Sequence, residues 1–456
     1  MEFNKIKNIP LYDALSELGK RIFLPDGIFY WSGRAKKEAE YIATVGSAFG
    51  FEKDFIDGGS NEWLPCYLGD LRNYSSIKIE ELVPYTSIGG LAKTREIWKN
   101  WIIKKAKYDK DKEKNKISRL EKFITKPLIT AGVTNGIYLA CSLFLNPGDH
   151  IISPNKRWGN YDNIIIRNLN AKIKSFDFFK NDRLNLEGLE ETIKEVSRKQ
   201  NKIIILLNFP NNPTGYIPLK EEANQLIEVL KRNQDKEKPI IVMVDDAYEP
   251  YVYEDKVLNK SIFYDLHELE EEVIPIKLDG ITKELLMYGG RVGFLTLGLK
   301  PKWFSNEADL EKAKEEILNK LEGMNRSTIS NCNYFYQAVT YKLFEQKGMD
   351  QIIAEQSKVK DLLKARYQKI NAEFAKIDNP DISIDPNSGG FFLFLNLNKI
   401  KATDFADHLL RKYKVGVIPT EKPKENINGI RIAYCSIDSS QIPEIVKRIQ
   451  LALNDF

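Results

Sequence analysis

Short runs of β-branched residues and leucine alternate, along the middle of the chain, with longer segments whose apolar residues recur every third or fourth position. The short runs lie at residues 151–152, 203–207, 240–244 and 291–295, and they are almost wholly apolar. Such runs are typical of strands covered on both faces, as in a parallel sheet. The segment Leu219 to Arg232 has helical periodicity. This alternation predicts an α/β fold with a mostly parallel, doubly wound sheet that binds ligands at the carboxyl ends of its strands.

The pattern changes near residue 345. A long helical segment is followed by a stretch from Ser383 to Leu397 with a Gly389-Gly390 break, and then by a short strand near Ile430. These features predict a smaller α+β domain. We therefore expect an N-terminal segment (1–75) that packs with the small domain, a large ligand-binding domain (76–330), and a C-terminal small domain with its connecting helix (331–456).

Composition excludes several classes of protein. The 456 residues are 43% hydrophobic, and 68 basic against 64 acidic side chains give a net charge of only +4. So small an imbalance gives no reason to expect nucleic acid or a membrane surface as a partner. Four separated cysteines and three scattered histidines lack the spacing of zinc ligands. The N-terminus resembles no signal or transit peptide, so we expect a cytoplasmic protein.

The segment from Lys104 to Lys122 is unusually rich in lysine. Acidic residues are interleaved with the lysines. This mixture favours a solvated helix or a surface insertion over a nucleic-acid-binding arm.

The most informative motif is the run Asn208 to Gly215 (NFPNNPTG), which lies between a predicted strand and a predicted helix. It is followed at ordered distances by Asp245, Lys283, Arg291 and Arg431. Asp245 ends a buried strand, where a carboxylate is costly unless it is paired. Lys283 follows another strand, which places an amine at the same edge of the sheet. Taken alone, the NFPNNPTG run would be a turn and each charged residue a surface residue. Taken together, they indicate a single functional site.

In this order the residues resemble the fold-type I aminotransferases of class I/II, which depend on pyridoxal phosphate (PLP). The resemblance extends from about Ala43 to Ala433 and is closest to the aspartate and aromatic aminotransferase branch. It implies that Lys283 forms an imine with the cofactor aldehyde and later moves the substrate's α-proton. It also implies that Asp245 keeps the pyridine nitrogen protonated, and that Tyr248 and Asn212 donate to the ring hydroxyl oxygen.

The resemblance also implies a phosphate site. The small-residue turn at 130–136 precedes a helical pattern, and backbone N–H groups at a helix N-terminus bind anions. Val133 and Thr134 occupy the positions that cradle the phosphate in the family. Arg291 would add a guanidinium clamp. The common serine three residues before the lysine is Gly280 here, and Thr282 is expected to replace its hydroxyl.

Two aromatic residues complete the implied cofactor site. Trp158 matches the residue that stacks on the pyridine ring and also borders the substrate. Tyr85 resembles the tyrosine that reaches the phosphate from the neighbouring subunit, so a homodimer with shared sites is expected. Tyr161 is a departure, because aspartate enzymes often have a histidine there.

Substrate recognition requires a partner for the α-carboxylate. Arg431 stands where the family has its bidentate arginine. Gly46 resembles the glycine whose backbone approaches the same carboxylate, where a Cβ would obstruct it. Arg326 resembles the arginine that aspartate-type enzymes send across the dimer to a distal carboxylate; its alternative is an ion pair at a helix end.

The resemblance therefore implies an aminotransferase that moves an α-amino group from aspartate, glutamate or an aromatic amino acid to 2-oxoglutarate by a ping-pong mechanism. A PLP-dependent lyase, either a carbon–sulfur β-lyase or an aspartate β-decarboxylase, stays open, because the cofactor does the electronic work and the pocket selects the bond. A non-catalytic PLP-binding regulator is a remote alternative, since no basic recognition helix precedes Tyr85.

Overall fold

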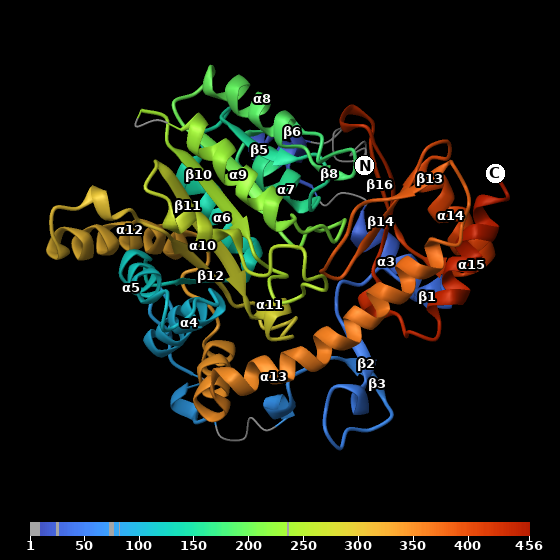
Figure 1. The fold of residues 1–456 in the computed structure, drawn as a ribbon, viewed down its shortest axis with the longest axis horizontal. Helices are drawn as coiled ribbons and strands as arrows, with labels where there is room; N and C mark the ends of the chain where they lie inside the picture. The colour runs from blue at the N-terminus through green and yellow to red at the C-terminus, as the bar shows by residue number, and fades with distance from the viewer. Residues whose placement is uncertain (1–9, 24–26, 73–76, 82, 235–236) are drawn as a thin grey trace.

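The computed structural model describes residues 10–23, 27–72, 77–81, 83–234 and 237–456. The two larger β-sheets lie at opposite sides of the molecule, and the long helix α13 (Tyr334–Phe374) runs from one toward the other (Figure 1). Helix α13 is interrupted at Gly348, whose φ of 74° is outside the helical range. Within the described ranges, no helix is long and apolar enough to cross a membrane.

The larger sheet has seven strands in the order β4-β12-β11-β10-β9-β5-β6. The strands from β11 to β6 are parallel to their neighbours, which confirms the mostly parallel α/β sheet. All residues of β9 and β10 are buried, as expected for strands covered on both faces. The strand bounds are β4 (Leu128–Thr130), β5 (His150–Pro154), β6 (Lys172–Phe176), β9 (Ile203–Asn208), β10 (Ile240–Asp245), β11 (Val273–Gly280) and β12 (Gly293–Leu297).

Strand β12 departs from the prediction, because it runs antiparallel to both β11 and β4. It begins at Gly293, so Arg291 and Val292 lie outside it. The chain between β11 and β12 forms the short helix α11 (Ile281–Glu284) and a turn at one edge of the sheet. A parallel strand would need a crossover back to the opposite edge. Because the chain instead turns back at the same edge, Lys283 and Arg291 lie beside the carboxyl ends of the parallel strands.

Alternate residues of the central strands contribute to two separate hydrophobic cores. Ile203, Ile205 and Leu207 belong to one, and Ile204 and Leu206 belong to the other. The first is covered by α8, α9 and α10, and the second by α6 and α12. The helix bounds are α4 (Ala92–Lys105), α5 (Lys114–Phe123), α6 (Val133–Phe144), α8 (Leu186–Ser197), α9 (Lys220–Asn233), α10 (Ile262–Glu268) and α12 (Glu307–Thr328).

The smaller sheet is antiparallel, with the order β13-β14-β17-β16; α14 packs with it, and α15 packs against α14 and α13. The N-terminal strand β1 pairs with β15 beside this sheet, and α3 also packs there (Figure 1). The division at residues 76 and 331 stays a prediction. The bounds are β13 (Ile382–Ile384), β14 (Leu393–Leu397), β15 (Val415–Gly416), β16 (Ile418–Lys422), β17 (Ile427–Ile432), α14 (Ala402–Tyr413), α15 (Ile442–Leu453), β1 (Tyr41–Ile42) and α3 (Ile28–Glu38).

The lysine-rich segment is helical at both ends. It covers the end of α4, a loop at 106–113, and most of α5, so the expected surface helix is present. The remaining short elements are α1 (Pro10–Asp13), α2 (Glu17–Arg21), α7 (Asn160–Asp162), β2 (Phe49–Phe51), β3 (Trp63–Pro65), β7 (Phe179–Lys180) and β8 (Arg183–Leu184).

Candidate active site

A cavity of about 360 Å³ lies at the carboxyl edge of the large sheet, and the small sheet contributes to its wall. Eleven of the thirteen predicted site residues line it, although they come from segments far apart in the chain. They are Gly46, Val133, Thr134, Trp158, Asn212, Asp245, Tyr248, Thr282, Lys283, Arg291 and Arg431.

The other two predicted residues lie outside this cavity in the chain that the structure describes. Tyr85 is 91% exposed. Arg326, near the end of α12, is also exposed and donates to the Ser330 hydroxyl. One chain therefore does not bring either side chain to the site, and a role through a neighbouring subunit stays a prediction for both.

Lys283 lies on α11 with its amine shielded from bulk solvent. The amine donates to the carbonyl oxygen of Gly46 and lies 4.9 Å from the Tyr288 ring centroid. Burial lowers its pKa to about 8, and the charges of Arg431 and Arg291 act in the same direction. A substantial fraction of the amine is therefore neutral near physiological pH, as a nucleophile or a proton acceptor requires.

Asp245 ends β10 and is only 5% exposed. One carboxylate oxygen accepts from the Tyr161 hydroxyl at 2.5 Å, and the other accepts from the Ala247 N–H at 3.2 Å. Burial raises the pKa of Asp245 to about 6, and these two hydrogen bonds oppose the rise. The neighbouring Asp246 faces elsewhere and pairs with Lys277, so only Asp245 of the two lines the cavity.

The turn between β4 and α6 has the features of an anion-binding site, which we call the anion cup. Val133 and Thr134 are the first residues of α6, where backbone N–H groups have no intrahelical acceptor. The Arg291 guanidinium lies beside Gly132, donating to the Ala131 carbonyl at 3.4 Å. The buried Thr282 hydroxyl has no hydrogen-bond partner within the described ranges. These donors fit a phosphate group.

Asn212, Tyr248 and Trp158 surround the middle of the cavity. The Asn212 N–H donates to the side-chain oxygen of Asn208 at 2.8 Å. The Tyr248 ring packs edge-on against Phe392 at 5.7 Å between centroids. The Trp158 ring makes a similar contact with Tyr161 at 5.5 Å. These contacts hold the Asn212 backbone and the rings of Tyr248 and Trp158 in place at the cavity.

Arg431, on β17, is buried and forms no ion pair with a described carboxylate. Its guanidinium donates to the Asn212 side-chain oxygen at 3.2 Å and to the Thr44 carbonyl at 3.1 Å, and its Nε has no partner. Burial lowers its pKa. A Cβ at Gly46 would lie 3.0 Å from the Phe392 ring, so glycine suits that crowded position. The Arg431 guanidinium and the side-chain-free Gly46 together fit a carboxylate ligand.

Several residues that line the cavity were not predicted. Asn208 begins the NFPNNPTG run, and its side-chain amide donates to the main-chain carbonyl of Asp245 at 2.8 Å, which joins the ends of β9 and β10. Tyr288 accepts from the Ala48 N–H at 2.9 Å. No local motif marks Tyr288, because Ala48 is distant from it in sequence. The others are Ile28, Ser47, Ala247, Gly280 and Phe392.

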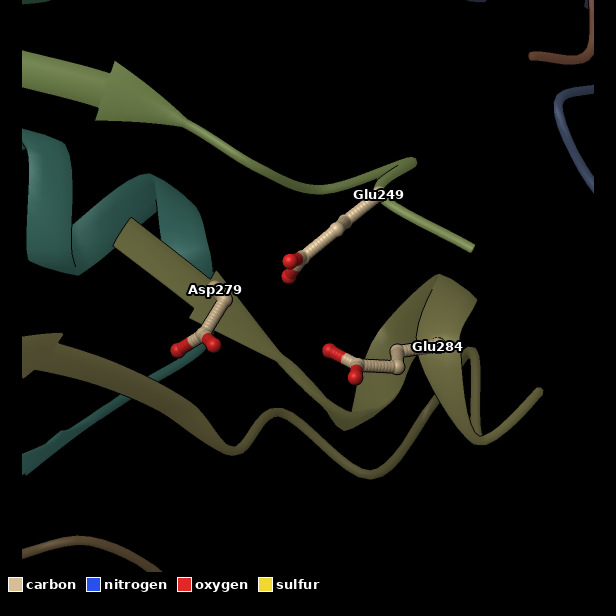
Figure 2. A group of neighbouring side chains, drawn as sticks. All are labelled: Glu249, Asp279 and Glu284. Carbon is tan, nitrogen blue, oxygen red and sulfur yellow. The ribbon is translucent and has the colours of Figure 1, made fainter. Parts of the chain in front are cut away.

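A buried ionic cluster lies behind α11. The carboxylates of Glu249, Asp279 and Glu284 point toward one another (Figure 2). The Lys105 ammonium lies among them, at 2.8, 3.1 and 2.7 Å respectively. The Lys105 ammonium occupies the position between the three carboxylates that a metal ion would take, so the three acids form an ion-pair cluster with this lysine. Burial raises the pKa of Glu284 to about 7, and Lys105 opposes the rise.

Comparisons with known proteins agree with this geometry. The family described as aminotransferase class I and II matches residues 114–449. An aspartate aminotransferase of Sulfolobus acidocaldarius is 26% identical over 342 residues, which cover 72% of this chain and 74% of that protein.

Two solved structures share the fold. An aminotransferase of Anaerococcus prevotii has a TM-score of 0.79 at 24% identity, covering 97% of this chain and 99% of its own. A Pyrococcus horikoshii kynurenine aminotransferase, solved in complex with PMP, has a TM-score of 0.72 at 16% identity, covering 98% of both chains. Because the family match covers most of the sequence, the chain belongs to the class I and II aminotransferases, enzymes with the fold-type I architecture.

Proposed function

We propose that the cavity holds pyridoxal phosphate attached through Lys283, and that the enzyme moves an α-amino group from an amino acid to a 2-oxo acid. The observation that carries this proposal is that one cavity contains a buried amine, a buried carboxylate and an anion cup, contributed by Lys283, Asp245 and the turn before α6. When bound, pyridoxal phosphate supplies an aldehyde that condenses with amines and a ring that accepts the electron pair of a broken Cα–H bond.

Residues of this chain would hold each part of the cofactor. Val133, Thr134, Thr282 and Arg291 fit the phosphate. Asp245 fits a ring N–H⁺, because a buried carboxylate is stabilised by an opposite charge. Three further side chains border the ring's space, which are Trp158, Asn212 and Tyr248.

Lys283 would act twice. Its neutral form attaches the cofactor and, once displaced by the substrate amine, takes the α-proton. Arg431 would bind the substrate α-carboxylate beside Gly46, which orients the Cα–H bond toward the Lys283 amine. Lys283, Arg431 and Gly46, the residues proposed to act on the substrate, therefore line one cavity in a single chain.

The substrate side chain and the assembly belong to the same proposal. We propose aspartate, glutamate or an aromatic amino acid as donor and 2-oxoglutarate as acceptor, in a cytoplasmic homodimer. Tyr85 supports the dimer, because it is 91% exposed near Val83 and Ile79, which are 73% and 64% exposed. In such a dimer, the exposed Arg326 would meet the distal carboxylate in the partner's site.

The visible spectrum of the purified protein tests the proposal. Pyridoxal phosphate is added, then aspartate, glutamate, tyrosine or alanine singly, and finally 2-oxoglutarate. We expect the cofactor band to convert with the preferred amino acid and to return with the oxo acid. The Lys283→Ala variant should lack the covalently attached form. Pyruvate and ammonia released without an oxo acid would indicate a lyase, and no absorbing species in folded protein would contradict cofactor binding.

A further inference from the structure

A second cavity, of about 590 Å³, lies on another part of the molecule. Its wall is formed by the end of α4, the loop at 106–113, α5, residues 249–260 and the middle of α13. It therefore includes much of the lysine-rich segment. No residue that lines the candidate active site also lines this cavity.

The charge of the wall is strongly positive. Only two acidic residues, Glu121 and Glu249, line the cavity. The Glu249 carboxylate is already engaged by Lys105 and Lys277, each at 2.8 Å. The lysines of the wall are Lys104, Lys105, Lys107, Lys110, Lys260 and Lys360.

Three of these lysines have carboxylate partners, and three have none within the described ranges. Lys104 pairs with Asp350 at 2.6 Å, and Lys260 pairs with Asp265 at 2.7 Å, while Lys105 belongs to the buried cluster. In contrast, no carboxylate of the described residues forms an ion pair with Lys107, Lys110 or Lys360.

Lys107 and Lys360 line the cavity from two different elements, the loop at 106–113 and α13. Lys107 donates to the Asn259 carbonyl, an uncharged acceptor, at 2.5 Å. Burial lowers the pKa of both lysines, while Glu249 raises the pKa of Lys107 and Asp361 raises that of Lys360. An anion in the cavity would be attracted by both ammonium groups.

The remaining wall is mostly apolar, and its polar residues are Asn100, Asn259, Gln356 and Ser357. Tyr108 contributes its ring, and its hydroxyl is occupied by Glu268 at 2.6 Å. Ile117, Met349 and Ile353 add aliphatic surface. A cavity of this volume, with apolar surface beside charged groups, fits a small organic molecule that carries acid groups.

We propose that this cavity binds a small organic anion with about two negative charges, as phosphate monoesters and dicarboxylates carry, joined to a short apolar body. Lys107 and Lys360 would contact the acid groups, and Tyr108, Met349 and Ile353 would contact the body. This site is separate from the proposed transamination and does not depend on it.

Titration calorimetry with two probes tests the proposal. The protein is first loaded with pyridoxal phosphate and then dialysed, so that the first cavity holds its cofactor and no free cofactor competes with the probes. Phenyl phosphate and 1,2-benzenedicarboxylate share a ring and differ in their acid groups, so the tighter one identifies the ligand chemistry. Inorganic phosphate serves as the probe without an apolar body. We expect one of the ring probes to bind once per chain, more tightly than inorganic phosphate, and more weakly at high salt.

Variants locate the binding. Lys107→Gln with Lys360→Gln should weaken the preferred probe by at least about tenfold, because each removes a charged hydrogen-bond donor. Lys369→Gln, on the same helix but outside the cavity, should leave binding unchanged. Should the double variant fail to fold, Lys110→Gln, on the exposed loop, is expected to weaken the probe as well. Absence of binding to the wild type, or unchanged binding by a folded double variant, would overturn the proposal.

Discussion

The contact between Tyr161 and Asp245 shows how one hydroxyl adjusts a buried acid. Without donors, burial would keep the Asp245 carboxyl protonated well above its usual pKa. The Tyr161 hydroxyl donates at 2.5 Å and favours the ionised form. Since the ionised form is the one that pairs with a ring N–H⁺, Tyr161 supports the site as a positioning residue from behind Asp245.

We therefore expect Tyr161→Phe to raise the pKa of Asp245 above about 6. Because activity needs the carboxylate, the acidic limb of the kcat/KM profile should move up by about one pH unit, since a hydrogen bond to a charged group contributes about 1.5–3 kcal/mol. The measurement is the pH dependence of kcat/KM. Tyr216→Phe, which loses a similar hydrogen bond to the remote Glu222, is the control. An unchanged profile would show that this donor does not adjust Asp245.

At the scale of elements, the junction between β4 and α6 depends on Gly132. Its φ of 78° is in the left-handed region, and an added Cβ would lie 2.6 Å from the Arg291 guanidinium. The turn and the clamp are therefore packed together. Glycine is needed here for both its backbone angle and its lack of a side chain.

Gly132→Ala is expected to weaken cofactor binding by displacing Arg291, in addition to straining the backbone by about 1–2 kcal/mol. Gly148→Ala is the matched control, because Gly148 has a φ of 88° but no atom within 4 Å of an added Cβ. Both variants should lose stability, and only Gly132→Ala should raise the Kd for pyridoxal phosphate in equilibrium dialysis. Equal dissociation constants for the two would contradict the steric argument.

The last turn of α4 anchors α11 through the buried cluster. Lys105 contacts three carboxylates, and the Trp101 indole N–H donates to Glu284 at 2.6 Å. Both α4 residues thus hold the residue next to Lys283. Removing one cation from such a cluster leaves carboxylates uncompensated in a dry environment.

Lys105→Met should therefore lower the free energy of unfolding by about 3–5 kcal/mol. Lys104→Met should cost much less, because its partner Asp350 is solvated, with a side chain 86% exposed. Urea unfolding of both variants provides the comparison. A loss of stability in Lys105→Met no larger than in Lys104→Met would show that the cluster is not a stabilising anchor.

At the scale of the whole molecule, one chain encloses most of the site but leaves Tyr85 and Arg326 outside. Segments beside the large sheet and the small sheet are joined by ion pairs such as Lys156–Asp385 at 2.6 Å and Arg157–Glu425 at 2.8 Å. The site thus depends on the packing of both sheets within one chain. We propose that a second chain contributes further residues to the site.

Mixed dimers test that addition. We expect Tyr85→Ala to bind pyridoxal phosphate weakly and Lys283→Ala to be inactive. If sites are shared, co-expression of the two chains restores one complete site per mixed dimer, with Lys283 from one chain and Tyr85 from the other. Activity at limiting cofactor measures the restoration, and each variant expressed alone is the control. A mixed dimer no more active than Tyr85→Ala would exclude a shared phosphate site.

The sequence by itself determined the features that depend on short-range order. The uniformly apolar runs of β9 and β10 predicted buried strands, and both are fully buried. Asp245 and Lys283 could be chosen because each follows a strand directly, so its place at the sheet edge depends on local chain direction. Family order then identified Arg291 and Arg431, and the structure brings all four to one cavity.

Only the tertiary structure decided contacts between distant segments. The direction of β12 depended on how the chain returns after α11. Tyr161 lies 84 residues before Asp245, and Lys105 comes from another helix than Glu284, so no local pattern could pair them. The basic cavity likewise arises where the lysine-rich segment meets α13. The burial and charge state of the side chains in these clusters are set by packing, because the same side chains on a solvated helix would be exposed and would keep their ordinary charge.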